Sequence, residues 1–122
     1  MRIVGGVGVP HTPHFPLLAA RDDDLGRDIT RLYGAVAAEF EAMRPDVVII
    51  VSSDHYNTFF VSSLPGFSIV TAPQATGPVD YTELAQRTVP MASDFAHRLQ
   101  NELVRLEFDV GQTQELGLDH PI

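Results

Sequence analysis

The chain has 122 residues, 44% of them hydrophobic and 20% charged, which is typical of one ordinary globular domain. Sixteen acidic residues against eight basic ones give a formal net charge of −8, so the chain lacks the basic face that a nucleic-acid partner requires. It has no cysteine and no apolar run of membrane-spanning length, so we expect a cytoplasmic protein without disulfides, thiolate metal sites or a membrane partner.

The first half of the chain predicts a strand, a helix and a second strand. Residues 2–9 (RIVGGVGV) are rich in β-branched residues and glycine, which is typical of a strand, and the prolines of the following loop, VPHTPHFP, disfavour a helix there. Three aspartates at 22–24 are typical of a helix start, and apolar residues then recur at spacings of three and four through residues 25–43. The unbroken apolar run at 47–51 (VVIIV) predicts a strand that is buried on both faces.

This order of elements brings two histidines to one place. A strand–helix–strand unit implies two parallel strands joined by a right-handed crossover, so both strands would end at the same sheet edge. His11 follows the first strand, and His55 follows the second within the polar sequence SSDHYN. Open α/β sheets bind ligands beyond the carboxyl ends of their strands. The sequence therefore predicts one site that contains His11 and His55.

The second half of the chain predicts two further strands and a helix. Residues 67–71 (FSIVT) and 108–110 (FDV) are candidate strands. Pro90 opens a predicted helix, and its apolar face carries Phe95, Leu99, Leu103 and Leu106. Residues 72–88 have weak periodicity and predict a long surface loop, and residues 112–122 (QTQELGLDHPI) predict a terminal loop.

These elements together indicate the fold class. We expect residues 1–122 to form a single α/β domain with a mostly parallel sheet flanked by helices. The few strands leave sheet edges open, and the sequence ends at Ile122 directly after a polar Asp-His pair. We therefore expect an incomplete portion of a larger domain that associates into a homo- or hetero-oligomer.

The histidines are candidate metal ligands. Neutral imidazoles of His11 and His55, completed by a carboxylate, would form a two-histidine, one-carboxylate face that suits non-haem Fe(II) and oxygen chemistry. The alternative for each is an ordinary hydrogen-bonded or surface histidine. His120 is a candidate base oriented by the adjacent Asp119, or a loop residue that forms hydrogen bonds. His97, in the middle of the second predicted helix, is expected to be solvated.

Other candidates follow the second strand. Tyr56, Asn57 and Phe59 are candidates for the lining of a substrate pocket, although core packing is the alternative for the phenylalanine. Asp54 precedes His55 and would point partly away from it, so we expect it to support a ligand or the local structure rather than to bind metal.

Three motifs, in this order, resemble the class III extradiol ring-cleavage dioxygenases. They are HTP at residues 11–13 after the glycine-rich segment, PDVVIIVSSDHYNTFF at 45–60, and LGLDH at 116–120. This superfamily includes the protocatechuate 4,5-dioxygenase catalytic subunit, gallate dioxygenase and 2,3-dihydroxyphenylpropionate 1,2-dioxygenase. The resemblance covers essentially the whole chain, which corresponds to the N-terminal half of the family's catalytic domain.

The resemblance implies an α/β fold and an Fe(II) centre that uses O₂ to open the ring of a catechol. It implies that His11 and His55 are iron ligands and that His120 acts in acid-base or substrate-binding work. The family's glutamate ligand comes from its C-terminal half, so no third ligand is expected in this chain, and we expect the fragment alone to be inactive. Pro121 stands where the family usually has glycine.

Two other functions are left open by the residues. One is a non-catalytic binding or interaction protein of the same fold with a degenerate metal site. The other is a different metal-dependent enzyme, such as a zinc hydrolase, in which Asp54, Glu83 or Glu115 would supply the missing carboxylate.

Overall fold

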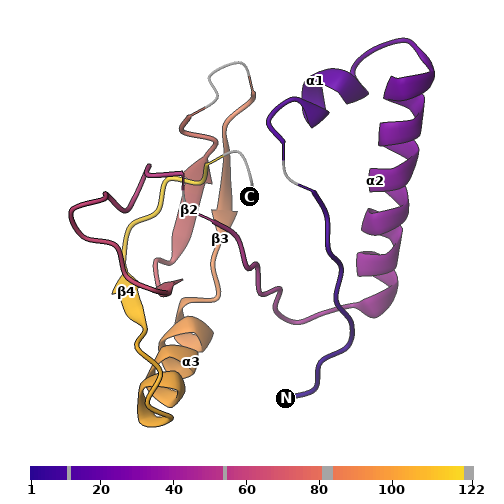
Figure 1. Ribbon diagram of the computed structural model, residues 1–122. Helices are drawn as coiled ribbons and strands as arrows, with labels where there is room; N and C mark the ends of the chain where they lie inside the picture. The colour runs from indigo at the N-terminus through magenta and orange to yellow at the C-terminus, as the bar shows by residue number, and fades with distance from the viewer. Residues whose placement is uncertain (11, 54, 81–83, 120–122) are drawn as a thin grey trace. The chain divides into compact units, whose positions relative to one another are not determined.

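The computed structural model describes residues 1–10, 12–53, 55–80 and 84–119, which fall into two compact units, 1–51 and 52–122. The units contain helices together with one parallel and one antiparallel pair of short strands, which confirms the α/β class (Figure 1). Within the described residues, no helix is both long enough and apolar enough to cross a membrane.

The first unit contains the helices α1 (Phe15–Ala19) and α2 (Asp24–Met43). The position of α2 confirms the helix predicted from the spacing of apolar residues. The short α1 was not predicted, because it begins inside the proline-rich segment; Pro16 lies in its first turn, where a proline removes no helical hydrogen bond. The two helices contact each other, and the rings of Phe15 and Tyr33 meet edge to face with their centroids 5.8 Å apart.

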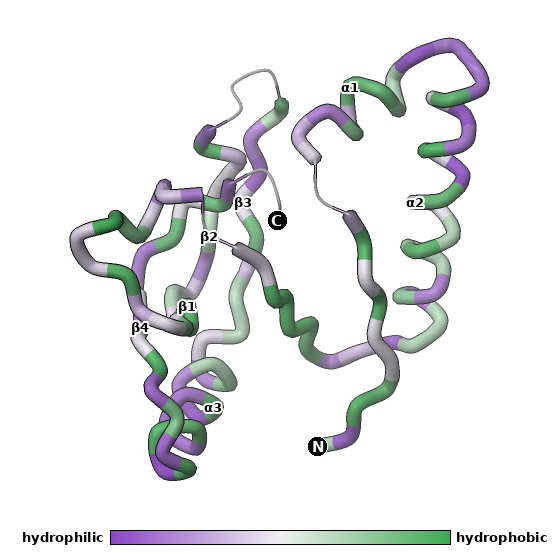
Figure 2. Tube along the Cα trace, in the orientation of Figure 1, coloured by the Kyte–Doolittle hydropathy of each residue, from purple (hydrophilic) through white to green (hydrophobic). Residues whose placement is uncertain are grey.

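The helix α2 is amphipathic, with hydrophobic and hydrophilic residues recurring along its length (Figure 2). Ile29 is buried, and Val36, Phe40 and Met43 are half-buried. The helix ends at Arg44, which has a left-handed φ of 47° and donates its main-chain N–H to the carbonyl oxygen of Phe40. This ending turns the chain away from the helix axis.

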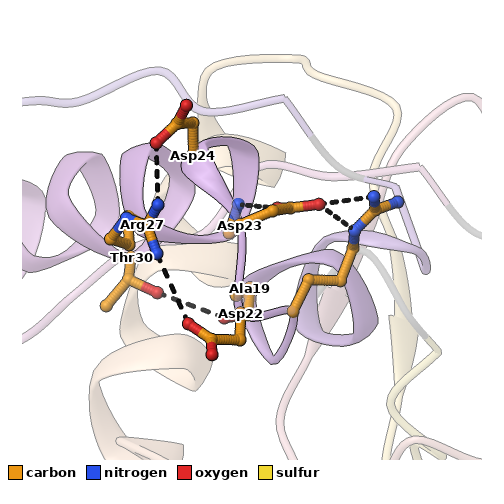
Figure 3. Close-up of polar contacts among 8 residues, drawn as sticks. Ala19, Asp22, Asp23, Asp24, Arg27 and Thr30 are labelled. Atoms are coloured by element: carbon orange, nitrogen blue, oxygen red, sulfur yellow. Dashed lines mark hydrogen bonds and ion pairs between the residues drawn. The ribbon is translucent and has the colours of Figure 1, made fainter.

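The start of α2 is fixed by an N-cap at Asp23 (Figure 3). Its Oδ1 accepts a hydrogen bond from the main-chain N–H of Gly26 at 2.9 Å, and its Oδ2 accepts one from Nε of Arg21 at 2.7 Å. The bond from Gly26, supported by the guanidinium of Arg21, holds the pKa of the Asp23 carboxyl below its usual value. Arg27 pairs with Asp24 at 2.7 Å on the exposed face, where one ion pair contributes little stability.

The structure does not form the two strands predicted in this unit. Neither residues 2–9 nor residues 47–51 are paired as a strand in the described part of the chain. The second segment, predicted to be buried on both faces, is instead exposed, from 38% at Val47 to 91% at Val51. A strand needs a row of backbone partners, which apolar composition alone does not provide. The predicted β-α-β unit is therefore wrong for these residues.

The N-terminal segment contacts α2 instead of a strand. In Figure 1 it runs beside that helix. Gly5 lies so close to the side chain of Met43 that a Cβ at this position would overlap the sulfur atom. The hydroxyl of Tyr33 donates a hydrogen bond to the carbonyl oxygen of Pro10 at 3.1 Å. The bond from Tyr33 places Pro10 against the middle of α2.

In its described residues, the second unit contains four short strands and one helix. β1 (Ser68–Val70) pairs in parallel with β4 (Gly111–Thr113), and β2 (Gln74–Gly77) pairs antiparallel with β3 (Arg87–Pro90). α3 (Ser93–Arg105) contacts β1. The position of β1 confirms the strand predicted at residues 67–71.

The segment between β1 and α3, and the start of α3, differ from the prediction. Residues 72–88 are not a continuous loop, because they contain β2 and the beginning of β3. Burial alternates along β2, but the buried positions are Ala75 and Gly77, which give a weak hydrophobic signal. The helix begins at Ser93 rather than at Pro90, which ends β3.

A strand was predicted at 108–110, but the structure forms it later, at Gly111–Thr113 (β4), because the residues that end α3 precede it. Glu107 has a left-handed φ of 66°, and the N–H of Phe108 donates to the carbonyl oxygen of Leu103 at 3.0 Å. This pair of features is a Schellman ending, which uses residues 107 and 108 to satisfy the helix carbonyls. The chain can therefore enter a strand only after that ending.

Thr71 is a buried polar residue of this unit, with 3% of its surface exposed. Its Oγ1 donates to the carbonyl oxygen of Thr113 at 3.2 Å and accepts a hydrogen bond from Nε2 of Gln112 at 2.8 Å. Its carbonyl oxygen accepts a hydrogen bond from Oγ of Ser93 at 2.6 Å. These bonds join the end of β1 to β4 and to the start of α3.

The substitution Asp23→Asn tests the charge at the N-cap. Asparagine keeps the acceptor for Gly26 but not the negative charge. Because the folded-state pKa of Asp23 lies below its usual value of 3.8, the wild type should gain stability from this carboxylate above that pH and lose it as the pH falls through the folded-state pKa. Urea unfolding at several pH values should show the difference between the two proteins shrinking in acid. A difference between the two proteins that stayed constant with pH would contradict a role for the charge at this N-cap.

A pair of glycine substitutions in α2 tests its packing. Gly34→Ala should raise the free energy of unfolding by about 0.5–1 kcal/mol, because a Cβ there meets nothing within 4 Å in the described residues and alanine favours the helix. Gly26→Ala should instead destabilise the protein, because its Cβ would overlap the main-chain carbonyl oxygen of Arg21. Urea unfolding followed by circular dichroism measures both, and equal effects of the two variants would contradict this packing.

Candidate functional site

The candidate site is centred on a pair of hydrogen bonds between His55 and Asp119. Oδ2 of Asp119 lies 2.9 Å from the main-chain nitrogen of His55 and 2.9 Å from its Nδ1. The carboxylate is buried, with 3% of its side chain exposed, whereas the imidazole side chain is 37% exposed. An ionised carboxylate only accepts hydrogen bonds, so both hydrogens of this pair come from His55.

Asp119 is held in place by main-chain hydrogen bonds of the residues before it. The N–H of Leu118 donates to the carbonyl oxygen of Thr76 at 3.0 Å, and the carbonyl oxygen of Leu118 accepts from the N–H of Val79 at 2.8 Å. A parallel bridge also pairs Gly117 with Thr76 of β2. Asp119 therefore follows directly on a short segment that is fixed to β2, although the sequence predicted a terminal loop there.

A glycine allows this segment to approach β2. A Cβ at Gly77 would overlap the main-chain carbonyl group of Leu118, so only glycine fits at this contact. Leu118 is itself buried, with 7% of its surface exposed. The close backbone approach thus sets the position of the following residue, Asp119.

The residues after His55 leave the site in an unusual conformation. Tyr56 has a left-handed φ of 61°, which costs a non-glycine residue about 1–2 kcal/mol, and it is 57% exposed. Asn57 is exposed, and Phe59 is half-buried. Phe59 lines an open hollow of about 560 Å³ together with several serines, among them Ser68. These are the three residues that the sequence placed in a substrate pocket, and only Phe59 among them lines this hollow.

Several predicted site residues lie outside the described residues. These are His11 and His120, the candidate ligand and the candidate base, together with Asp54 and Glu83. Glu115, the remaining candidate carboxylate, is exposed. In the ranges that the structure describes, no group of three histidine or acidic side chains gathers in a way that could hold a metal ion. His97 lies on α3 and is half-buried rather than fully solvated.

The partner of His55 was not found from the sequence. Asp119 was considered only as an orienting group for the adjacent His120, but its carboxylate bonds to a histidine 64 positions earlier in the chain. No local pattern connects the two residues. The alternation of LGLD at 116–119 would place Asp119 on the face opposite Leu118, whereas the structure buries both residues, so this pattern gave no signal for the contact.

Comparisons with known proteins address the identity of this chain. A family model described as the catalytic LigB subunit of aromatic ring-opening dioxygenase matches residues 5–122. Several curated relatives carry the name 2,3-dihydroxyphenylpropionate/2,3-dihydroxicinnamic acid 1,2-dioxygenase. The protein from Mycobacterium sp. (strain MCS) is 34% identical over 117 residues, and the one from Comamonas testosteroni is 30% identical over 115 residues. The one from Cupriavidus necator is 29% identical over 93 residues.

The matches cover most of this chain but little of each relative. They include 89%, 93% and 76% of this chain, and 34%, 34% and 29% of the respective relatives. The chain thus spans about a third of the length of the curated relatives that it matches.

Gly77→Ala tests the contact that positions Asp119. The added methyl group should displace Leu118 and lower the free energy of unfolding by about 1–3 kcal/mol, the usual cost of overpacking. Gly66→Ala is the matched control, because a Cβ there meets nothing within 4 Å in the described residues. Urea unfolding gives the stabilities, and the amide NMR shift of His55 reports its bond to Asp119. If Gly77→Ala leaves both quantities as Gly66→Ala does, the contact does not position Asp119.

Proposed function

The chain belongs to the family of catalytic LigB subunits of aromatic ring-opening dioxygenases, since the family model covers residues 5–122, and on this premise we propose that the protein uses O₂ to open the ring of a catechol. The family match carries the proposal. The matched residues include all three sequence motifs that resemble this family, at 11–13, 45–60 and 116–120. We propose a non-haem Fe(II) ion as the cofactor.

The proposed substrate is an aromatic ring with two adjacent hydroxyl groups. The relatives are named for 2,3-dihydroxyphenylpropionate and the corresponding cinnamic acid, both of which are such vicinal diols. The proposed reaction breaks one ring carbon–carbon bond beside the diol and places both atoms of O₂ in the ring-opened product.

We propose that His11 and His55 hold the iron. Imidazole nitrogen is a suitable ligand for this metal. Metal-binding histidines usually donate their second ring N–H to a carboxylate or carbonyl group, and Nδ1 of His55 makes such a bond to Asp119. The donor chemistry of His55 therefore fits the metal, while the role of His11 rests on the HTP motif. No third ligand is assigned within residues 1–122.

When bound, Fe(II) supplies the electron transfer that allows a catechol to react with O₂. The protein's own residues supply the remaining work. We propose that His120 accepts a proton from a catechol hydroxyl as a general base. Tyr56 and Phe59 provide aromatic surface beside the substrate ring, and Asn57 provides a polar group next to them. Of these three residues, Phe59 lines the open hollow, and the placement of Tyr56 and Asn57 rests on their position in the sequence directly after His55.

The proposed context follows the family. We propose that residues 1–122 are the N-terminal part of a catalytic domain. We further propose that the protein acts in the cytoplasm as a homo- or hetero-oligomer, with no nucleic-acid partner. The net charge of −8 supports the last point.

The substitution His55→Ala tests the proposed function in the full-length natural protein, loaded with Fe(II) without air. The wild type should consume O₂ and convert 2,3-dihydroxyphenylpropionate or protocatechuate to a yellow ring-opened product. His55→Ala should lose iron binding and ring opening by more than the ten- to hundredfold typical of removing a group that only supports a ligand. Iron content, O₂ uptake and visible absorbance are the measurements.

His97→Ala is the matched control, because it removes a histidine of the same unit on α3 and keeps a good helix former. It should retain iron and activity. A wild type that binds no iron and opens no catechol would contradict the proposal and favour a binding protein of the same fold. A wild type that requires zinc and hydrolyses a substrate would favour the metal-dependent hydrolase.

A further inference from the structure

We propose that Asp119 is a positioning residue that selects the tautomer of His55, so that Nδ1 carries the hydrogen and Nε2 presents its lone pair to the metal. This inference rests on the proposed function for the statement that His55 binds a metal. It goes further because it gives Asp119, which the sequence suggested only as an orienting group for the adjacent His120, a role toward His55.

The geometry of the two hydrogen bonds supports this role. Both reach the same oxygen, Oδ2, at 2.9 Å, one from the main chain of His55 and one from its ring. Neutral imidazole carries one hydrogen, on either nitrogen. A carboxylate at Nδ1 stabilises the tautomer that has the hydrogen there, and the lone pair is then on Nε2. The hydrogen bond from the main-chain N–H holds the backbone of His55, to which the ring is attached, at the same oxygen atom.

The burial of Asp119 makes the arrangement rigid. The side chain is 3% exposed, so water cannot replace a hydrogen bond that His55 withdraws. Rotating the imidazole away from Oδ2 would leave a buried carboxylate short of a donor, which is strongly unfavourable. The backbone before Asp119 is itself fixed by the bonds of Leu118 to Thr76 and Val79. The tautomer is therefore set before any metal arrives.

The experiment measures the tautomer directly in the full-length natural protein. Histidines are labelled with ¹⁵N, and long-range proton–nitrogen NMR spectra of the metal-free protein at mildly alkaline pH distinguish Nδ1–H from Nε2–H. Zn(II) serves as a diamagnetic probe, and its affinity is measured by calorimetry. The variants are Asp119→Ala, which removes the acceptor, and Asp119→Asn, which keeps an acceptor oxygen without the charge.

We expect His55 of the wild type to be the Nδ1–H tautomer. Asp119→Ala should shift it towards Nε2–H and weaken Zn(II) binding by about ten- to a hundredfold, the range typical of removing a ligand's hydrogen-bond partner. Asp119→Asn should restore much of the Nδ1–H population, because the amide oxygen can take the place of Oδ2.

Thr71→Val is the matched control. Thr71 is as buried as Asp119, and its hydroxyl group forms hydrogen bonds with Thr113 and Gln112 in the same unit, which valine would remove. The variant should lower the melting temperature but leave the tautomer of His55 and the Zn(II) affinity unchanged. A merely structural role of Asp119 would make its variants behave as Thr71→Val does.

Two outcomes overturn the inference. One is a wild-type His55 in the Nε2–H form, which decides the matter even if Asp119→Ala fails to fold. The other is a folded Asp119→Ala with wild-type tautomer and affinity. Failure of the proposed function is distinguishable. A protein whose Zn(II) binding depends on Asp119 but that opens no catechol rejects the function and retains the inference. A wild type that opens catechols, together with either of the two outcomes above, rejects the inference and retains the function.

Discussion

The arrangement of the second unit depends on the hydrogen bonds that one buried carboxylate accepts. Asp119 exposes only 3% of its side chain, and a charge with so little water around it is tolerated only when hydrogen-bond donors surround it. His55 supplies two donors to the same oxygen, both at 2.9 Å. This requirement holds together two segments that lie 64 positions apart in the chain, and it fixes both the backbone and the ring of the histidine.

The two short sheets of this unit, β1 with β4 and β2 with β3, provide the frame for that pair. Thr71 joins the end of β1 to β4 and α3 through its hydroxyl and its carbonyl oxygen. At the next strand, Gly77 permits Leu118 to lie against the backbone of β2. Gly77 thus allows the two backbones to approach, and the approach places Asp119 where His55 can reach it. The site is a consequence of main-chain packing more than of side-chain volume.

The first unit is held by more local interactions. The N-cap at Asp23 and the left-handed ending at Arg44 set the limits of α2, and the contacts of Tyr33 bring the N-terminal segment and α1 to that helix. Its apolar runs at residues 2–9 and 47–51 find no strand partner among the described residues. A run of β-branched residues therefore indicates a preference for the strand conformation, but it does not show whether a neighbouring strand is available for pairing.

The sequence by itself determined the features that depend on near neighbours. These include the limits of α2, the strand at β1, the approximate place of α3, the α/β class and, through three motifs, the family. It also placed His55 in a polar cluster after an apolar run. Only the tertiary structure decided that β2 and β3 pair, that β4 begins after a Schellman ending, and that Asp119 bonds to His55 rather than serving only its neighbour. The physical reason is that a helix is closed by bonds four residues apart, whereas strand pairing and the burial of a charge depend on partners whose distance along the chain no local pattern encodes.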